Sequence, residues 1–296
     1  MKFIRFSNGK GATLGVRRGE EVIDLSGATE MPIPDLPSLL ASGSEALQWI
    51  DKLVQKAPSK AVHAYAAIKP LVPLASPEKI ICIGLNYAEH IKEAPTPQEV
   101  PQYPVVFLRT ARSLIAHGEP ILRPRCSEQL DFEGELACII GKPARNVSRD
   151  KALDHVGGYA LFNDASIRDY QFKSHQWTMG KNFDATGPFG PEVITADELP
   201  RGAVGLHLST RLNGEVVQSA STNDLIFDIA TLISELSVAM TLMPGDVIVT
   251  GTPSGVGLGR TPRLWMKHGD VCEIRVDGFE PLINPIRDDD RTAPSL

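Results

Sequence analysis

Residues 130–140 (LDFEGELACII) constrain this chain more than any other stretch, because they combine a strand pattern with three carboxylates. Side chains alternate between the two faces of a β-strand, so Asp131, Glu133 and Glu135 would share one face. That face continues with two apolar residues, which indicates that the acids lie at the rim of a buried surface. Inward carboxylates about 7 Å apart repel one another and lose hydration unless a cation or a proton compensates them. The simplest compensation is a hard divalent metal ion, and the alternative is an edge strand whose inward charges oppose aggregation.

Carboxylate ligands of this kind are typical of Mg²⁺ or Mn²⁺, which usually keep positions for water or substrate. Glu133 and Glu135 would supply two ligands, and Asp164, which follows the predicted strand 157–163, would supply a third. Asp131 would support these ligands from beside them. Zinc is a weaker interpretation, because the sequence contains no HxH, HExxH or CxxC pattern.

A short helix is predicted over residues 87–93, with Asn86 as its N-cap. His90 and Glu93 are three residues apart and therefore share a face of that helix, so Glu93 would orient the imidazole and raise its basicity. His90 is thus the candidate proton-transfer group, and a surface histidine is the alternative. The proline-rich segment 93–103 would be either a lid over a site or a surface loop.

Two cationic side chains are further candidates. Lys181 follows a glycine and could place its ammonium against an oxyanion, and a solvated loop lysine is the alternative. Arg168 lies beside Asp169 shortly after the predicted strand 157–163. These two residues could equally form an exposed ion pair, which would contribute very little to stability.

The pattern of strands and turns predicts two domains. Residues 1–72 would form a small accessory domain of short strands followed by a helix over 36–56. Three prolines fall within residues 70–77, which indicates an extended connection and places the boundary there. The larger domain, residues 73–296, contains predicted strands at 79–84, 105–108, 130–140, 157–163, 206–212, 215–218 and 247–250. Asn213-Gly214 predicts a type I′ hairpin, and apolar residues at helical spacing predict a helix over 229–240.

Charge and composition exclude some partners. The net charge of -6 argues against nucleic acid or an anionic membrane as a partner. The first residues contain no long apolar segment, and no run of 18 or more apolar residues follows, so we expect a cytoplasmic protein. The four cysteines are widely spaced without a CxxC pair, so we expect reduced thiols.

Several motifs, taken in their order along the chain, resemble the fumarylacetoacetate hydrolase superfamily over about residues 78–285. These motifs are GLNYAEH at 84–90, EGE at 133–135, GGY at 157–159, ND at 163–164, RDYQ at 168–171, GK at 180–181, PGD at 244–246 and TGTPSGVG at 250–257. The ordered set is much more specific than any one motif. The small N-terminal domain is similar to that of the longer bacterial members.

The resemblance implies an α+β fold that is mainly β, with a mixed β-sandwich roll and a small N-terminal α+β domain, often assembled as a homodimer. It implies a Mg²⁺ or Mn²⁺ ion bound by Glu133, Glu135 and Asp164, with Ca²⁺ as a substitute in crystals. It also implies roles for the residues at matching motif positions: catalytic His90, Glu93 and Lys181, and substrate-binding Arg168, Gln171 and Thr252.

The activity that the resemblance implies is metal-dependent hydrolysis of a C–C bond in an acylpyruvate or related 2,4-dioxo acid, such as fumarylpyruvate or fumarylacetoacetate. Such acids arise in the catabolism of aromatic compounds or sugar acids. His90 would activate water, and Lys181 with the Thr252 region would stabilise the oxyanion of the tetrahedral intermediate.

Other outcomes stay open, because the same metal-stabilised enolate serves more than one reaction. The alternatives are isomerisation of hydroxymuconate-type dienes, decarboxylation of oxaloacetate and dehydration of sugar acids. A metal-binding protein without catalysis is a remote alternative. The His90–Glu93 pair favours hydrolysis, since water activation needs a base.

Overall fold

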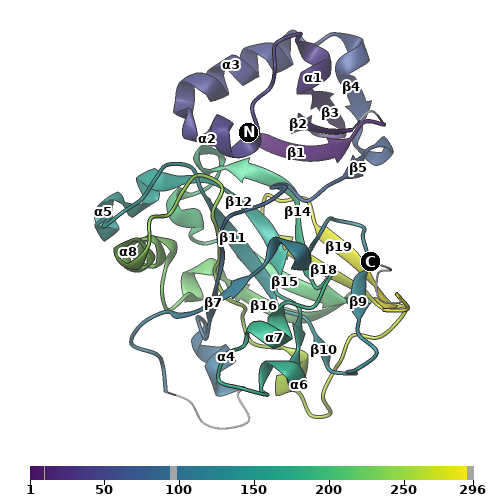
Figure 1. The fold of residues 1–296 in the computed structure, drawn as a ribbon, viewed down its shortest axis with the longest axis vertical. Coiled ribbons are helices and arrows are strands. Elements are labelled where there is room, and N and C mark those ends of the chain that lie inside the picture. The colour runs from purple at the N-terminus through teal and green to yellow at the C-terminus, as the bar shows by residue number, and fades with distance from the viewer. Residues whose placement is uncertain (10, 94–98, 292–296) are drawn as a thin grey trace, which may run out of the picture.

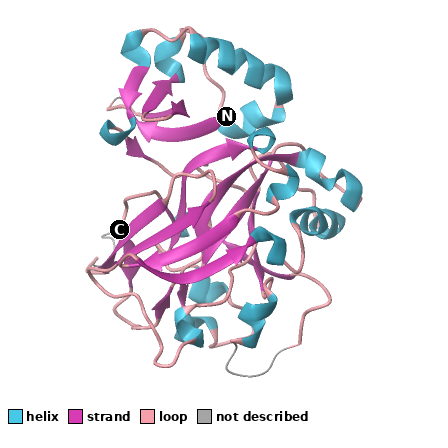
Figure 2. Cartoon of the chain, turned by 180° about the vertical axis from the view of Figure 1, so that it is seen from behind, coloured by secondary structure: helices cyan, strands magenta, loops and turns pink. Residues whose placement is uncertain are grey.

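The computed structural model describes residues 1–9, 11–93 and 99–291. Figures 1 and 2 show the N-terminal elements gathered at one end of the molecule and a larger, strand-rich body at the other. This arrangement confirms the predicted fold class, which is mainly β with a small α+β region at the N-terminus. Residues 94–98 of the predicted lid segment lie outside the described residues.

The larger sheet has 12 strands among the described residues, and it runs through both ends of the molecule. Its strand order is β4 (Val62–Ala64), β3 (Glu21–Asp24), β2 (Ala12–Arg18), β1 (Lys2–Ser7), β14 (Gly187–Thr195), β12 (Val156–Asn163), β11 (Gly134–Ile140), β17 (Val247–Val249), β6 (Ile80–Gly84) and β7 (Val105–Arg109). Two short strands join it from the side: β5 (Lys69–Pro70) pairs with β1, and β8 (Leu114–Ile115) pairs with β14.

The remaining described strands form two further sheets. The five-stranded sheet has the order β16 (Glu215–Ser221), β15 (His207–Leu212), β18 (Val271–Val276), β19 (Leu282–Asp288) and β9 (Ile121–Arg123). The strands β10 (Leu130–Asp131) and β13 (Ser166–Ile167) pair with each other. The β15–β16 connection confirms the predicted hairpin, because Asn213 and Gly214 both have positive φ, as a type I′ turn requires.

Short helices accompany these sheets. They are α1 (Leu25–Ala28), α2 (Leu36–Ala41), α3 (Gly43–Gln55), α4 (Ala88–Lys92), α5 (Arg149–Ala152), α6 (Arg168–Gln171), α7 (Thr178–Lys181) and α8 (Ile229–Ala239). The single helix predicted over 36–56 is therefore divided. The division falls at Ser42 and Gly43, where Gly43 has a φ of 71°, outside the helical region. In the described part of the chain no helix is long and apolar enough to cross a membrane.

The N-terminal region continues the central sheet directly. Strand β1 pairs antiparallel with β14, with Phe3 opposite Val193. Side chains of both regions share one apolar cluster, in which Phe3 and Leu40 pack with Ile139 and Phe162. The boundary near residue 72 stays a prediction, and the pairing shows that sheet and core cross it.

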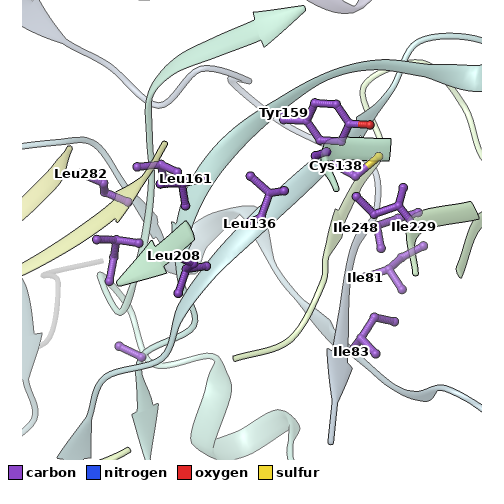
Figure 3. Close-up of a cluster of buried hydrophobic side chains, with 14 of the residues drawn as sticks. Ile81, Ile83, Leu136, Cys138, Tyr159, Leu161, Leu208, Ile229, Ile248 and Leu282 are labelled. Carbon is purple, nitrogen blue, oxygen red and sulfur yellow. The ribbon is translucent and has the colours of Figure 1, made fainter. Parts of the chain in front are cut away.

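Strand β11 lies at the centre of the larger sheet and buries both faces. Leu136, Cys138 and Ile140 belong to one apolar cluster. Figure 3 shows Leu136 and Cys138 in it, together with Tyr159, Leu161, Leu208 and Ile229. Ala137 and Ile139 belong to the other cluster. Because β12 and β17 pair with its two edges, the edge-strand alternative is wrong.

The strand predicted over 130–140 is interrupted at Phe132 and Glu133. There the backbone N–H of Phe132 donates to Asp131 Oδ1 (2.9 Å), and that of Glu133 donates to Asn163 Oδ1 (3.0 Å). Side chains therefore replace the ladder partners, and β10 pairs with β13 while β11 pairs with β12. The interruption separates Asp131, on β10, from the group of three acids that contains Glu133 and Glu135.

Asn86 is not a helix cap, although its place before α4 predicts one. Its amide bonds instead to the backbones of Phe227 (Oδ1 accepts from N–H, 2.7 Å) and Thr250 (Nδ2 donates to O, 2.7 Å). Tyr87 occupies the N-cap position of α4. Asn86 is fully buried, and it fastens the start of α4 to two distant segments.

Candidate metal and catalytic site

Three carboxylates meet where β11 and β12 lie side by side. Glu133 and Glu135 flank Gly134, and Gly134 is opposite Asn163, so Asp164 emerges next to Glu133. The backbone N–H of Asp164 donates to the Glu133 carbonyl over 2.9 Å. One oxygen from each of the three carboxylates lies within 4.8 Å of the others, and all three residues are buried. The structure thus brings together the three predicted metal ligands.

Glycine is needed between the two glutamates because the backbone passes close to the second sheet. A Cβ at Gly134 would lie 2.1 Å from Thr210 Oγ1 and 2.9 Å from a carbon of Ile274. Both distances are shorter than real Cβ contacts. The E-G-E sequence therefore places two acids on one rim while letting β11 approach the five-stranded sheet.

Two cations neutralise part of this charge. Lys181 Nζ donates to Glu133 Oε2 and to Asp164 Oδ2, each over 2.6 Å, and Arg168 Nη1 lies 2.6 Å from Glu133 Oε1. Lys181 and Arg168 are 2% and 3% exposed, so the interpretations of a solvated lysine and of an exposed Arg168–Asp169 pair are wrong. Asp169 instead accepts a hydrogen bond from Ser127 Oγ.

The pKa values of Glu133 and Glu135 are shifted in opposite directions, because different charged groups surround them. Burial alone would raise the pKa of Glu133, but the Lys181 ammonium and the Arg168 guanidinium lower it to about 2. Burial and the carboxylates of Asp164 and Glu133 raise the pKa of Glu135 well above its usual range. Among the described residues, Glu135 accepts a hydrogen bond only from the backbone N–H of Gly251 (2.5 Å). The three acids therefore lack positive charge at Glu135.

A divalent cation would supply this charge. The donor set is made of carboxylate oxygens alone, which suits Mg²⁺, Mn²⁺ or Ca²⁺ and not zinc. Glu133, Glu135 and Asp164 would bind the ion. The observation that supports this fit is that, in the described part of the chain, no cationic side chain contacts Glu135, whereas Glu133 and Asp164 each have one or more.

The candidate base lies on α4, across from the carboxylates. His90 Nδ1 is 3.2 Å from Glu93 Oε2, as the three-residue spacing predicts. The other oxygen, Glu93 Oε1, accepts the backbone N–H of Gly255 over 2.6 Å. A Cβ at Gly259 would lie 2.8 Å from Glu93 Cβ, so this glycine-rich loop packs directly on Glu93. Glu93 therefore connects the histidine to the loop.

A cavity of about 250 Å³ joins these groups. Figure 1 shows α4, α6 and α7 together at the end of the molecule away from the N-terminal region. The cavity is lined by His90 and Glu93, by Glu133 and Glu135, and by the apolar side chains Phe107, Trp177, Val256 and Leu258. The rings of Phe107 and Trp177 are 5.5 Å apart in an edge-to-face arrangement. One end of the cavity is therefore charged, and its other walls are apolar.

The predicted substrate residues all line this cavity, but their hydrogen bonds differ. Arg168 Nη1 also donates to Gln171 Oε1 (2.9 Å), while Arg168 Nη2 is buried and has no partner in the described part of the chain. Thr252 Oγ1 donates to the Gly134 carbonyl (3.1 Å) and accepts from Gln218 Nε2 (2.8 Å). Arg168 thus offers a free N–H, whereas the Thr252 hydroxyl proton points to backbone.

Asp131 supports the site from a distance. It accepts hydrogen bonds from Arg168 Nε (2.8 Å) and from the backbone N–H groups of Gly257 and Leu258 (2.7 and 2.9 Å). It is fully buried and is not among the three grouped acids. Its carboxylate fixes the position of Arg168 against the glycine-rich loop.

The sequence motifs missed two polar residues of the site. Arg109 Nη1 donates to Asp164 Oδ1 over 2.6 Å, and Gln218 bonds to Thr252 and to the backbone N–H of Gly134. Arg109 lies two residues after Phe107 on β7 and therefore on the same face of the strand, so strand periodicity could have placed both side chains inward. Gln218 has no comparable signal, because it lies on a strand of the other sheet.

Known proteins share this architecture. A family model described as Fumarylacetoacetate (FAA) hydrolase C-terminal matches residues 79–287. The chain belongs to the fumarylacetoacetate hydrolase family. This confirms the family resemblance and makes the protein a metal-dependent enzyme of that superfamily whose buried acids are consistent with a divalent ion.

Members with an N-terminal extension are among its relatives. The chain is 38% identical over 279 residues to oxaloacetate tautomerase fahd2, mitochondrial, of Xenopus laevis, covering 92% of this chain and 85% of that protein. It is 37% identical over 282 residues to oxaloacetate tautomerase YisK of Bacillus subtilis, covering 90% and 93%. A crystal structure of maleylpyruvate hydrolase from Sphingobium sp. SYK-6 in complex with manganese (II) ion and pyruvate matches with a TM-score of 0.80 and 29% identity, over 97% of this chain and 99% of that one.

Proposed function

We propose that this protein interconverts the keto and enol forms of a 2-oxo dicarboxylic acid of the oxaloacetate type, with Mg²⁺ or Mn²⁺ bound by Glu133, Glu135 and Asp164. The observation that carries the proposal is that one cavity contains both the acidic site and the His90–Glu93 pair. Two relatives named oxaloacetate tautomerase support it, as does the related structure with manganese and pyruvate. This replaces hydrolysis, which the sequence favoured, as the leading reaction.

The reaction moves one proton between C3 and the 2-oxo oxygen and breaks no carbon–carbon bond. Glu93 occupies Nδ1 of His90, so Nε2 is the nitrogen available to exchange a proton at C3. Arg168 Nη2 would bind a substrate carboxylate, since it is a buried N–H without a partner in the described residues. The Lys181 ammonium lies among the acids and would donate to the 2-oxo oxygen. The chemistry that a bound divalent ion supplies is Lewis-acid polarisation of the 2-oxo group.

Hydrolysis of an acylpyruvate is the second candidate, and the apolar part of the cavity favours it. Phe107 and Trp177 form a wall that a four-carbon dicarboxylate has no apolar group to contact. A Cβ at Gly84 would lie 2.2 Å from Trp177, so the wall depends on glycine at that position. An acylpyruvate would place its distal acyl group against this wall, and His90 would then activate water.

A panel of substrates separates the two reactions. We expect Mn²⁺-loaded enzyme to accelerate the ketonisation of enol-oxaloacetate, and EDTA to abolish the acceleration. The reaction is monitored by the loss of the ultraviolet absorbance of the enol. Acylpyruvate cleavage and oxaloacetate decarboxylation are measured in parallel. Rapid acylpyruvate cleavage without any effect on enol-oxaloacetate would replace tautomerisation by hydrolysis as the function.

The partner of this site is a small 2-oxo acid. A homodimer and a cytoplasmic location stay predictions, as does the absence of nucleic-acid and membrane partners. Size-exclusion chromatography with light scattering on the full chain tests the dimer. A monomer at micromolar concentration would contradict it.

A further inference from the structure

We propose that Arg109 is a positioning residue that fixes which oxygen of Asp164 faces the metal site. The inference rests on the metal site of the proposed function. Arg109 lies on β7, two residues after the cavity-lining Phe107, and its side chain is completely buried. Arg109 does not line the cavity, so it would act on the site through Asp164.

All three guanidinium nitrogens of Arg109 have acceptors. Nη1 donates to Asp164 Oδ1 over 2.6 Å and to the Ala165 carbonyl over 3.2 Å. Nη2 donates to Thr186 Oγ1 over 2.8 Å, and Nε donates to Ser113 Oγ over 3.2 Å. A planar group bonded on three sides cannot turn without losing several bonds. Arg109 is therefore a rigid donor at a fixed place behind Asp164.

This donor divides the two oxygens of Asp164 between two roles. Oδ1 is taken by Arg109, and Oδ2 faces Lys181 and the other acids. Glu133 repeats the pattern, with Oε1 on Arg168 and Oε2 on Lys181. Asp164 differs from Glu133 in one respect, because Arg168 and Lys181 both line the cavity whereas Arg109 binds Asp164 from outside it. Such outer bonds to ligands commonly change metal affinity by about 10- to 100-fold.

A lysine at this position would keep the charge and lose the geometry. Its ammonium is a single point, whereas Asp164, Thr186 and Ser113 lie on different nitrogens of the fork. Arg109→Lys therefore separates orientation from charge compensation. Ser113→Ala is milder, because it removes only one of the Arg109 hydrogen bonds, the one from Nε.

The chain offers a matched control for Ser113. Ser113 and Ser237 are both completely buried. Each accepts one N–H and donates to the carbonyl three residues earlier: Ser113 accepts from Arg109 and donates to Thr110, and Ser237 accepts from Val147 and donates to Ser234. Ser237→Ala thus removes the same bonds on α8 without touching Arg109.

The test measures Mn²⁺ affinity by calorimetry and the melting temperature in EDTA for wild type, Arg109→Lys, Ser113→Ala and Ser237→Ala. We expect Mn²⁺ binding to weaken about 10- to 100-fold in Arg109→Lys and several-fold in Ser113→Ala. Ser237→Ala should lower the melting temperature as Ser113→Ala does and leave Mn²⁺ affinity unchanged.

Wild-type Mn²⁺ affinity in Arg109→Lys would overturn the inference. If that variant does not fold, equal Mn²⁺ affinities of the two serine variants would overturn it. Wild-type protein that fails to bind Mn²⁺ would instead overturn the metal site of the proposed function, so the two failures are distinguishable.

Discussion

Glu192 and Glu135 are two buried acids on strands of the larger sheet, and they differ in the cations that contact them. Glu192 on β14 pairs with Arg17 (3.3 Å) and Lys2 (3.4 Å), and its Oε1 also accepts the backbone N–H of Glu280. Glu135 on β11 is buried to a similar degree, 2% exposed against 1% for Glu192. It forms no ion pair within the described ranges of the chain.

The difference shows why burial of an acid does not by itself indicate a site. Arg17 also binds Glu280 (2.8 Å) and stacks on the Tyr65 ring, so the Glu192 cluster fastens the N-terminal region to the body. In the site, Glu133 forms ion pairs with Lys181 and Arg168, and Asp164 forms one with Arg109. Glu135, which has no ion-pair partner among the described residues, is the acid that predicts a bound cation.

The largest expected effect comes from removing that acid. Glu135→Ala should lower turnover of 2-oxo acids by at least about 1000-fold, because the ion would lose a ligand and its affinity. Steady-state kinetics with saturating Mn²⁺ and circular dichroism of the same sample check it. A folded variant with wild-type turnover would show that the carboxylate group is not the metal site.

His90→Ala is expected to have the next largest effect. Loss of the proton-transfer group should reduce kcat about 10²- to 10⁴-fold while Mn²⁺ affinity stays near that of wild type. Kinetics and calorimetry on one preparation give both values. Unchanged kcat would remove His90 from the mechanism, whereas a parallel loss of Mn²⁺ affinity would indicate a metal ligand instead.

The Glu192 cluster should respond in stability and not in chemistry. Arg17→Met leaves buried Glu192 with Lys2 as its remaining ion-pair partner among the described residues, so we expect a loss of about 3 kcal/mol in the free energy of unfolding. Urea unfolding measures the loss, and kcat per folded molecule should remain at the wild-type value. A reduced kcat at unchanged stability would contradict the structural role of this cluster.

The smallest effect concerns pH and the metal-free protein. The pKa of Glu135 is raised in the folded state by burial and by Asp164 and Glu133. Its contribution to stability is therefore present below the ordinary glutamate pKa, about 4.3, and is lost as pH rises through the raised folded value. In EDTA, as the pH is raised above the ordinary glutamate pKa, the melting temperature of wild type should fall by a few degrees more than that of Glu135→Gln. Parallel pH profiles of the two proteins would contradict the uncompensated charge.

The opposite shift at Glu133 occurs in another pH range and does not obscure this result. Its folded pKa of about 2 means that its stabilising contribution is lost as pH falls below the ordinary glutamate range. Both proteins keep Glu133, so they share that loss. Their difference above the ordinary range reports Glu135.

Local patterns in the sequence predicted the parts of the site that lie close together along the chain. The E-G-E spacing placed Glu133 and Glu135 on one rim, and the three-residue spacing paired His90 with Glu93. Both follow from the periodicity of strands and helices. The hairpin at Asn213 was equally local.

Other features depend on pairing between distant segments, which one sequence does not specify. Asn86 looked like a cap because caps are local, but bonds to segments more than 130 residues away determine its role. For Lys181, the residues along the chain left a solvated loop lysine as the alternative, and the fold shows the acids that surround it. Arg109 carried no motif at all, since its partner Asp164 lies on another strand.

The pairing of β1 with β14 has a consequence for folding during synthesis. Ile4 lies opposite Glu192, so the first strand gains its neighbour only after almost two thirds of the chain has been made. At about 5–20 residues per second, that delay is roughly 10 to 40 s. During this time β1 pairs with β2 and, at Phe6 and Ser7, with β5, while its edge at Lys2–Ile4 lacks the partner that β14 provides. Nascent chains of this protein should therefore depend on chaperones until β14 emerges from the ribosome.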